Sequence, residues 1–509
     1  MASSGERITD SQPKFDGGLN SVSSETALLT NQVRSSVNAR LTDYGAISKR
    51  GGTRRTASVL AAFPITGGYT WAKDDGTYPV LAVCNGLLFT STYNTSTWTW
   101  TQRTGALSST TTSQLITFRD GSTDVVYIAD GGLLNKWNGS ALSTNLAGTP
   151  SCSALAVYNE RLWGCGDPTF PDSVFYSDFS NGDTLGVGGS GGGQIVVRTF
   201  GNETIVGLAA INTSLMVFHK RGISRITGYG QDDITVQPQG VTSDVGAIAK
   251  NSIVASQNIA YFISERGLYR CNESDVGAVG TPDQPDPILP ILRKLSSTDF
   301  DNISCVLNRA TKELWITIPT VGCYQYHTVL QAWSGPWEDA YLNPGTTALF
   351  EGINQNGLPI VLRGDNAGYV SVCDAPNIFV DNVSSDGTGG SRYTMSVQFH
   401  RLYCGDDSLA KSLRWGYLTA QLNGSDQCRV QWTTGDFSAS FSLPASYIST
   451  WGDPATAWGT GTWGGAGSVS YRIPMGGTGY YVDVLLVDSG RGQPVFSRFQ
   501  LEAFSLGRR

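Results

Sequence analysis

The chain has 509 residues, too many for one ordinary hydrophobic core, so we expect one large repeat-built domain with additions. It contains 61 Gly, 20 Pro, 13 Trp and 21 Tyr but only 15% charged residues, which favours many short strands and tight turns over long helices. The net charge of −7 argues against a dedicated DNA-binding surface, because phosphate recognition needs a concentrated excess of Lys and Arg.

Membrane and redox signals are also weak. No stretch reaches the ~18 apolar residues of a membrane-spanning helix, and the first residues lack the apolar region of a signal peptide. We therefore expect synthesis in the cytoplasm and no membrane insertion. Nine cysteines without a C-x-x-C motif fit reduced, mostly buried thiols better than a disulfide framework or a zinc site.

Residues 1–58 are polar and end in a basic run, and we interpret them as an extended N-terminal arm rather than a core segment. The basic run is Lys49-Arg50-Gly51-Gly52-Thr53-Arg54-Arg55. Two interpretations of it stay open: a solvated loop, or a contact with phosphate or with carboxylates of a partner.

Residues 59–382 repeat one pattern, in which two short apolar strands flank a Gly- or Asn-centred turn. Seven such units start at intervals of roughly 30 to 50 residues, near the period of propeller blades. Turns such as Asn85-Gly86 can supply the positive φ angles that hairpins need. The pattern predicts an all-β protein with a β-propeller of six to eight blades, seven being the favoured count. The segment before Tyr69 could add a strand to the last blade.

Residues 383–391 have the composition of a flexible linker, and residues 392–509 follow as a separate unit. Apolar and polar residues alternate there with period two over about six strands, which predicts an antiparallel β-sandwich at the C-terminus.

Sequence motifs for chemistry are not convincing. The run Gly186–Gly193 matches dinucleotide and nucleophile-elbow patterns only formally, because a strand rather than a helix is expected after it. His219, His327 and His400 lie far apart, without metal spacing, and the acidic doublets fall in expected turns. We therefore assign no catalytic, cofactor-binding or metal-ligating residue and predict no enzyme activity.

Tryptophans form local clusters. Trp333 and Trp337 are expected in the core, whereas Trp451, Trp458 and Trp463 lie in a turn-rich segment that permits exposure. Those three either stack on sugars or a partner protein, or cover the ends of the sheets.

Five short segments follow one another near the N-terminus. They are Phe15-Asp16-Gly17-Gly18-Leu19-Asn20, Leu29-Thr30-Asn31-Gln32, Asn38-Ala39-Arg40, Tyr44-Gly45-Ala46-Ile47 and Lys49-Arg50-Gly51-Gly52-Thr53-Arg54. Together they resemble the start of the tail nozzle or tail hub (tail stabilisation) proteins of short-tailed bacteriophages. The later segments Val157–Trp163 and Ser264–Tyr269 are similar in kind to blade segments of those proteins.

The resemblance implies a structural virion protein in the phage tail, synthesised in the host cytoplasm. Such a protomer forms a homo-oligomeric ring, commonly of six copies, that extends the portal–adaptor channel for DNA exit and docks fibres or spikes. Six copies at −7 each would carry −42, and a lumen that repels DNA lets the transiently passing genome slide. Interface residues are expected among Phe15, Leu19, Arg50, Arg54, Arg55, Trp451, Trp458 and Trp463.

Two other functions stay open. The first is a glycan-binding protein that recognises the host through the tryptophan-rich segment. The second, less favoured, is a propeller glycosidase that uses two carboxylates in the central channel.

Overall fold

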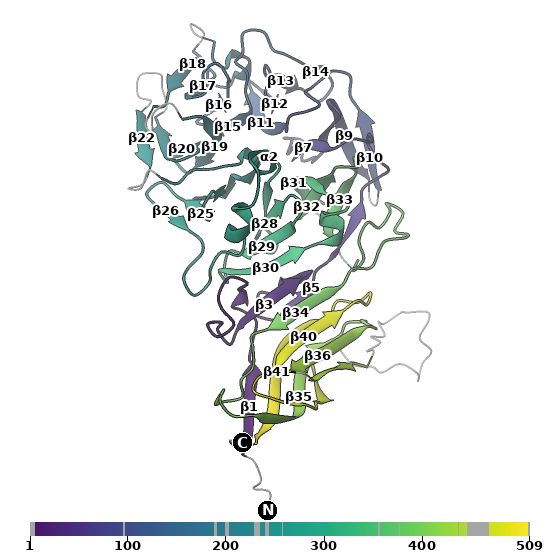
Figure 1. The fold of residues 1–509 in the computed structure, drawn as a ribbon. Helices are drawn as coiled ribbons and strands as arrows, with labels where there is room; N and C mark the ends of the chain where they lie inside the picture. Colours follow the sequence, from purple (N-terminus) through teal and green to yellow (C-terminus); the bar gives the residue numbers. More distant parts are fainter. Residues whose placement is uncertain are drawn as a thin grey trace, which may run out of the picture.

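The computed structural model describes residues 6–94, 97–187, 191–198, 203–228, 235–239, 244–256, 258–354, 357–375, 377–435, 437–444 and 468–506. The chain forms two bodies, a ring of small sheets and, next to it, a pair of longer sheets that holds both termini (Figure 1). Strands make up nearly all of the regular structure. The predicted all-β, β-propeller fold class is confirmed.

The ring consists of seven four-stranded antiparallel sheets in the described part of the chain. The first four are β7 (Ile65–Thr70), β8 (Val80–Cys84), β9 (Leu87–Asn94) and β10 (Thr97–Gln102); β11 (Gln114–Asp120), β12 (Thr123–Ala129), β13 (Asn135–Trp137) and β14 (Leu142–Ser143); β15 (Ala154–Tyr158), β16 (Arg161–Cys165), β17 (Ser173–Tyr176) and β18 (Gly193–Val196); and β19 (Ile205–Ile211), β20 (Ser214–His219), β21 (Ile223–Thr227) and β22 (Thr235–Gln239).

The remaining sheets complete the ring. They are β23 (Val254–Ser256), β24 (Ile259–Ser264), β25 (Gly267–Cys271) and β26 (Val276–Ala278); β27 (Ser304–Asn308), β28 (Glu313–Ile318), β29 (Gly322–His327) and β30 (Ala332–Trp337); and β31 (Thr346–Ile353), β32 (Pro359–Asp365) and β33 (Val370–Ala375) with β6 (Gly52–Arg55). We number these sheets one to seven in chain order.

An N-terminal strand completes the seventh sheet. Strand β6 pairs with β33 in antiparallel register, Ser371 opposite Arg55 and Val372 opposite Arg54. The prediction that the segment before Tyr69 adds a strand to the last blade is therefore confirmed.

Contacts between the innermost strands close the ring. Each of β7, β11, β15, β19, β23, β27 and β31 contacts the next, and β31 contacts β7 again. The apolar core is divided accordingly, with one buried cluster between each pair of neighbouring sheets. Between sheets seven and one, Phe350 packs with Ile65 and Val80, and a Cβ on Gly68 would lie 2.1 Å from its ring. Glycine at position 68 thus permits the close approach that closes the ring.

Local turn chemistry sets the hairpins of the sheets. Asn85 and Gly86 have φ of 52° and 70°, and they join β8 to β9 in a two-residue loop that opposes Cys84 and Leu87. Two consecutive positive φ angles match the right-handed twist of the flanking strands. Asn159 and Glu160 form the same kind of loop, with φ of 48° and 56°.

The second body is a sandwich of two sheets. One contains β38 (Val469–Pro474), β35 (Lys411–Gln421), β41 (Val495–Ser505), β5 (Ile47–Lys49), β4 (Ala39–Leu41), β1 (Arg7–Gln12) and β39 (Thr478–Gly479). The other contains β2 (Gly18–Leu19), β3 (Gln32–Val37), β34 (Met395–Phe399), β40 (Asp483–Asp488), β36 (Cys428–Thr434) and β37 (Phe437–Ser442).

The sandwich is built from both ends of the chain. Five of its strands, β1 to β5, come from residues 7–49, and Phe15, Val33 and Ile47 are buried in its core. The interpretation of residues 1–58 as an extended arm is therefore wrong for the described part of that segment. These strands are only two to six residues long, too short to show a clear alternation in the sequence.

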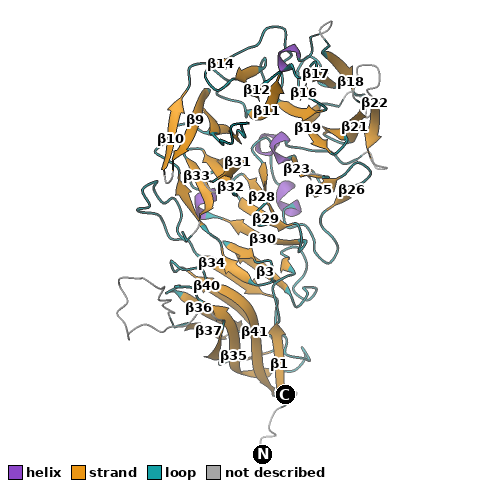
Figure 2. Ribbon diagram, turned by 180° about the vertical axis from the view of Figure 1, so that it is seen from behind, coloured by secondary structure: helices purple, strands orange, loops and turns teal. Residues whose placement is uncertain are grey.

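Helices are few and short. They are α1 (Leu289–Leu292) and α2 (Ser297–Phe300), with the 3₁₀ turns η1 (Gly182–Thr184), η2 (Lys250–Ser252) and η3 (Asp339–Tyr341). Both views place α2 near the centre of the ring (Figures 1 and 2). Within the described residues, no helix has the length and apolar character needed to cross a membrane.

Ring closure predicts a large effect of Phe350→Ala. This substitution removes a buried ring between sheets seven and one, and we expect it to lower the free energy of unfolding by about 3–5 kcal/mol. Urea denaturation followed by tryptophan fluorescence measures the change. Phe437→Ala, in sandwich strand β37 where the side chain is 43% exposed, is the control with little expected effect. Equal losses in the two variants would show that this contact does not hold the ring closed.

Candidate functional site

Two residues predicted at an interface lie instead in the interior. The ring of Phe15 is fully buried and packs on Phe399, with 5.5 Å between ring centroids. Leu19 is buried in the same cluster as Trp333, between the sandwich and sheet six. The prediction of Phe15 and Leu19 as interface residues is wrong, because both are needed to pack the chain's own core.

Arg50, a third predicted interface residue, is also fully buried and joins the two bodies. Its Nη1 and Nη2 atoms donate to the two carboxylate oxygens of Asp381 at 2.8 and 2.5 Å, and its Nε donates to Oδ1 of Asn38 at 2.9 Å. The guanidinium lies 3.8 Å from the ring centroid of Tyr393, and Nη2 also donates to the carbonyl of Glu338. Asp381 follows the last propeller strand and Tyr393 precedes the sandwich strand β34, so one side chain links the ring, the linker and the sandwich.

Other charges at this junction are paired too. The ammonium of Lys49 lies 3.0 Å from Asp488 and donates to the carbonyl of Gly490, and burial lowers the pKa of this lysine. Arg40 donates to Glu313 at 2.8 Å and to Asp374 at 2.5 Å, which connects the sandwich with sheets six and seven. The first half of the basic run therefore makes internal ion pairs, not a solvated or phosphate-binding loop.

The second half of the basic run is more accessible. Arg54 and Arg55 are partly exposed on β6, at the outer edge of sheet seven. Arg54 donates to the carbonyl of Ser385 at 2.5 Å, and Arg55 lies over the ring of Tyr369 at 3.8 Å. Both stay available to a partner.

The tryptophan predictions divide in two. Trp333 and Trp337 are fully buried, as expected for core residues. Trp451, Trp458 and Trp463 lie outside the described residues, so their prediction as interface residues remains a prediction.

Titratable side chains serve the packing of the fold. Each histidine is held by a hydrogen bond, His219 to Ser224, His327 to Asp43 and His400 to Gln12. All nine cysteines are buried and unpaired, and burial raises their pKa, to about 11 for Cys373 and about 12 for Cys165. Across the described residues, no group of three or more His, Cys, Asp and Glu side chains is placed to hold a metal ion.

Lys250 crosses the axis of the ring. It belongs to η2, just before sheet five, yet its Nζ donates to the carbonyls of Thr112 at 2.7 Å and Ser153 at 3.0 Å, just before sheets two and three. Lys250 thus starts beside sheet five and reaches acceptors beside sheets two and three. Sheet four separates sheet five from sheet three along the ring, so the side chain reaches them by spanning the central opening. Burial lowers its pKa to about 8.

An exposed apolar patch lies where the sandwich meets the ring. Leu29 and Val329 border a groove of about 480 Å³, and they are 48% and 63% exposed. Tyr44 is 95% exposed and follows Asp43, whose carboxylate bonds His327, two residues before Val329. We call Leu29, Tyr44 and Val329 the junction patch. Exposed apolar groups gathered in this way are typical of surfaces that contact another protein.

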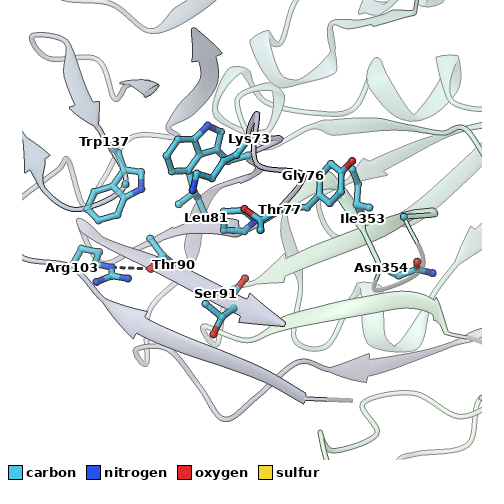
Figure 3. A pocket seen from close by; sticks show the side chains of 16 residues that line it. Lys73, Gly76, Thr77, Leu81, Thr90, Ser91, Arg103, Trp137, Ile353 and Asn354 are labelled. Atoms are coloured by element: carbon cyan, nitrogen blue, oxygen red, sulfur yellow. Dashed lines mark hydrogen bonds between the residues drawn. The ribbon is translucent and has the colours of Figure 1, made fainter. Parts of the chain in front are cut away.

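A separate cleft of about 520 Å³ opens between sheets one, two and seven (Figure 3). Its walls come from the β7–β8 connection, strand β9, the end of β13 and the β31–β32 connection. The lining residues are Trp71, Lys73, Gly76, Thr77, Tyr78, Pro79, Leu81, Thr90, Ser91, Thr92, Arg103, Trp137, Gly139, Ile353, Asn354 and Gly357. A cavity of this size is in the range of small-molecule sites.

Cations and aromatic rings meet in this cleft. The Arg103 guanidinium lies 5.2 Å from the ring centroid of Trp137, and its Nε donates to Oγ1 of Thr90 at 2.8 Å (Figure 3). Lys73 lies 5.3 Å from the ring centroid of Trp71 and pairs with Asp75 at 2.8 Å. Sequence reasoning missed the cleft, because its residues are spread between positions 71 and 357.

The three comparisons with known proteins differ in outcome, because only solved structures match the chain. No protein-family model matches the chain, and no curated protein matches it. Among solved structures, the extracellular domain of a putative one-component system from B. thetaiotaomicron matches at 12% identity and TM-score 0.42, over 65% of this chain and 40% of that chain.

Two further structures match at a similar level. The extracellular domain of a putative hybrid two-component system from B. thetaiotaomicron matches at 14% identity and TM-score 0.39, over 66% of this chain and 45% of that chain. U3-55K matches at 9% identity and TM-score 0.40, over 63% of this chain and 98% of that chain. The chain thus spans less than half the length of the two bacterial domains.

Breaking the buried ion pair should destabilise the protein. Asp381→Asn leaves Arg50 buried without a charged partner, and we expect a loss of about 3–5 kcal/mol in the free energy of unfolding. Asp386→Asn, an exposed change in the same connection between β33 and β34, is the matched control. The double variant Arg50→Met/Asp381→Leu removes both charges and should regain part of the loss. A single-variant loss no larger than that of the control, by urea denaturation, would contradict this role.

The axial lysine predicts a pH dependence of stability. Because burial lowers the pKa of Lys250 from 10.5 to about 8, folding releases a proton between these pH values. The stability that this residue contributes therefore rises between pH 8 and pH 10.5 and is lost as the pH falls through 8. We expect the free energy of unfolding of the wild type, relative to Lys250→Met, to increase from pH 7 to pH 10. The exposed change Lys294→Met should show no such trend, and a constant difference for Lys250→Met would refute the assignment.

Proposed function

We propose that this protein is a structural subunit of a homo-oligomeric ring in the tail of a short-tailed bacteriophage. In this role it extends the portal–adaptor channel through which DNA leaves and provides docking surfaces for fibres or spikes.

The observation that carries this proposal is the placement of the segments that resemble tail nozzle and tail hub proteins. They run from Phe15 to Arg54, and they supply strands to both sheets of the sandwich and to the last propeller sheet. Within them lie Arg40 and Arg50, whose ion pairs join one body to the other, and Lys49, whose buried ion pair with Asp488 lies within the sandwich. A protomer of this kind is rigid, and rigidity is what a ring that transmits a channel requires.

The junction patch supports assembly through a second copy of the chain. Leu29 and Tyr44 are exposed apolar side chains in the β2–β3 and β4–β5 loops of the sandwich, and Val329 is one in the β29–β30 loop of sheet six. A neighbouring copy can bury them. Arg54 and Arg55 are partly exposed on the outer strand of sheet seven, where a carboxylate of a partner can reach them.

The proposed DNA channel does not run through the propeller of one copy. Lys250 crosses the propeller axis, so the propeller itself offers no open bore for a duplex. In the proposed assembly DNA passes along the common axis between copies. Their net negative charge then favours sliding over binding.

This proposal predicts rings that depend on the junction patch. Purified protein, alone or bound to the portal–adaptor complex, should form rings in electron micrographs and sediment as a closed oligomer. Val329→Glu and Tyr44→Glu each place a charge in the patch and should yield monomers with unchanged melting temperature.

The control is Phe170→Glu, at an apolar position that is 46% exposed in the β16–β17 loop of sheet three, which should assemble normally. Monomers of the wild type, both alone and with the portal–adaptor complex, would refute the proposed function. Rings that persist in both patch variants would exclude this patch as the contact between copies.

A further inference from the structure

We infer that the cleft between sheets one, two and seven binds an acidic saccharide, a sugar that carries a carboxylate or phosphate group. This site is distinct from the junction patch and does not depend on ring assembly.

The charge of the lining points to an anion. Lys73 and Arg103 are the two charged residues among the 16 that line the cleft, and no carboxylate lines it. The whole chain, in contrast, has more acidic than basic residues, 42 against 35. Asp75 stands outside the lining and pairs with Lys73 at 2.8 Å, so the excess positive charge of the cavity comes from Arg103. An anionic group is therefore favoured inside it.

Arg103 is held ready for such a group. Its Nε is held by Thr90 and its guanidinium lies over the Trp137 ring, two contacts that restrict the rotation of the side chain. No described acceptor takes a hydrogen bond from Nη1 or Nη2 of this residue. Two terminal nitrogens in a fixed plane match the oxygens of a carboxylate or phosphate.

The rest of the lining suits a polyhydroxylated ring. Thr77, Thr90, Ser91 and Thr92 bring hydroxyl groups, and Asn354 brings an amide. The Thr77 hydroxyl donates to Asp75 and the Thr90 hydroxyl accepts from Arg103 Nε, and each keeps its other hydrogen-bonding role for a sugar hydroxyl. Pro79, Leu81 and Ile353 add apolar surface for the C–H faces of a sugar.

A nucleobase fits this cleft less well than a sugar. Trp71 and Trp137 are only 3% and 2% exposed, and cations lie over both rings. A base could not lie flat on either ring, which is the usual contact in nucleotide binding. Tyr78, at 41% exposure, is the aromatic ring that a ligand can reach at the rim.

Binding is tested with a panel of saccharides on the full-length protein. The panel contains glucuronate, galacturonate, N-acetylneuraminate and sugar phosphates, each with its uncharged counterpart, and thymidine monophosphate as the nucleotide. Calorimetry should show at least one acidic saccharide that binds at least about tenfold more tightly than its uncharged counterpart. The carboxylate and phosphate arms tell which anionic group the cleft takes.

Variants locate the binding to the cleft. Arg103→Gln should weaken the affinity at least about tenfold, as expected for the loss of a charged hydrogen bond, and Tyr78→Ala should weaken it severalfold. Arg266→Gln removes the same charge from an exposed turn between β24 and β25 and should bind like the wild type. If Arg103→Gln does not fold, Lys73→Gln, at a side chain that is 33% exposed, tests the same cavity.

Several results would overturn the inference. These are no binding of any acidic saccharide, equal binding of the uncharged counterparts, tighter binding of thymidine monophosphate, or unchanged affinity in both Arg103→Gln and Lys73→Gln. Each can occur whether or not the protein forms rings, so this inference and the proposed function can fail separately.

Discussion

The buried ion pair between Arg50 and Asp381 holds the two bodies of this protein in one arrangement. Removing both charges from water is costly, and the cost is offset only when their hydrogen bonds are well placed. Here Arg50 meets two carboxylate oxygens, the amide oxygen of Asn38 and the ring of Tyr393. A shift of either body would break several of these contacts at once, so the pair selects one angle between ring and sandwich.

The same N-terminal segment completes the propeller. Residues 52–55 pair with residues 371–375, so the seventh sheet forms only when two segments more than 300 residues apart in the sequence meet. Such contacts carry a loop-closure cost that rises with the number of residues between the paired segments. The cluster of Phe350, Ile65 and Val80 then supplies the apolar contact that offsets this cost.

Local signals in the sequence predicted the fold well, and long-range pairs escaped them. Asn85-Gly86 is a two-residue hairpin turn as expected, because its positive φ angles are a property of those residues alone. Arg50 lies 331 positions from Asp381, so the basic run has no acidic partner close to it in the sequence. A run of this kind is readily interpreted as exposed to solvent. Gly51 indicates how closely this run is packed, since a Cβ there would lie 2.1 Å from Oδ1 of Asp374. The cleft was likewise invisible, because ring closure brings Asn354 beside Trp71.

Ring closure therefore links stability and recognition in this molecule. The cleft has walls from sheets one, two and seven, and sheets one and seven meet only in the closed ring. A ligand that bridges these walls binds the closed form alone, and it stabilises that form by mass action. The junction patch lies elsewhere, beside sheet six and the sandwich, and none of its residues lines the cleft. In the proposed assembly, contacts between copies through this patch would leave the cleft open, so assembly and saccharide binding would not compete for the same surface.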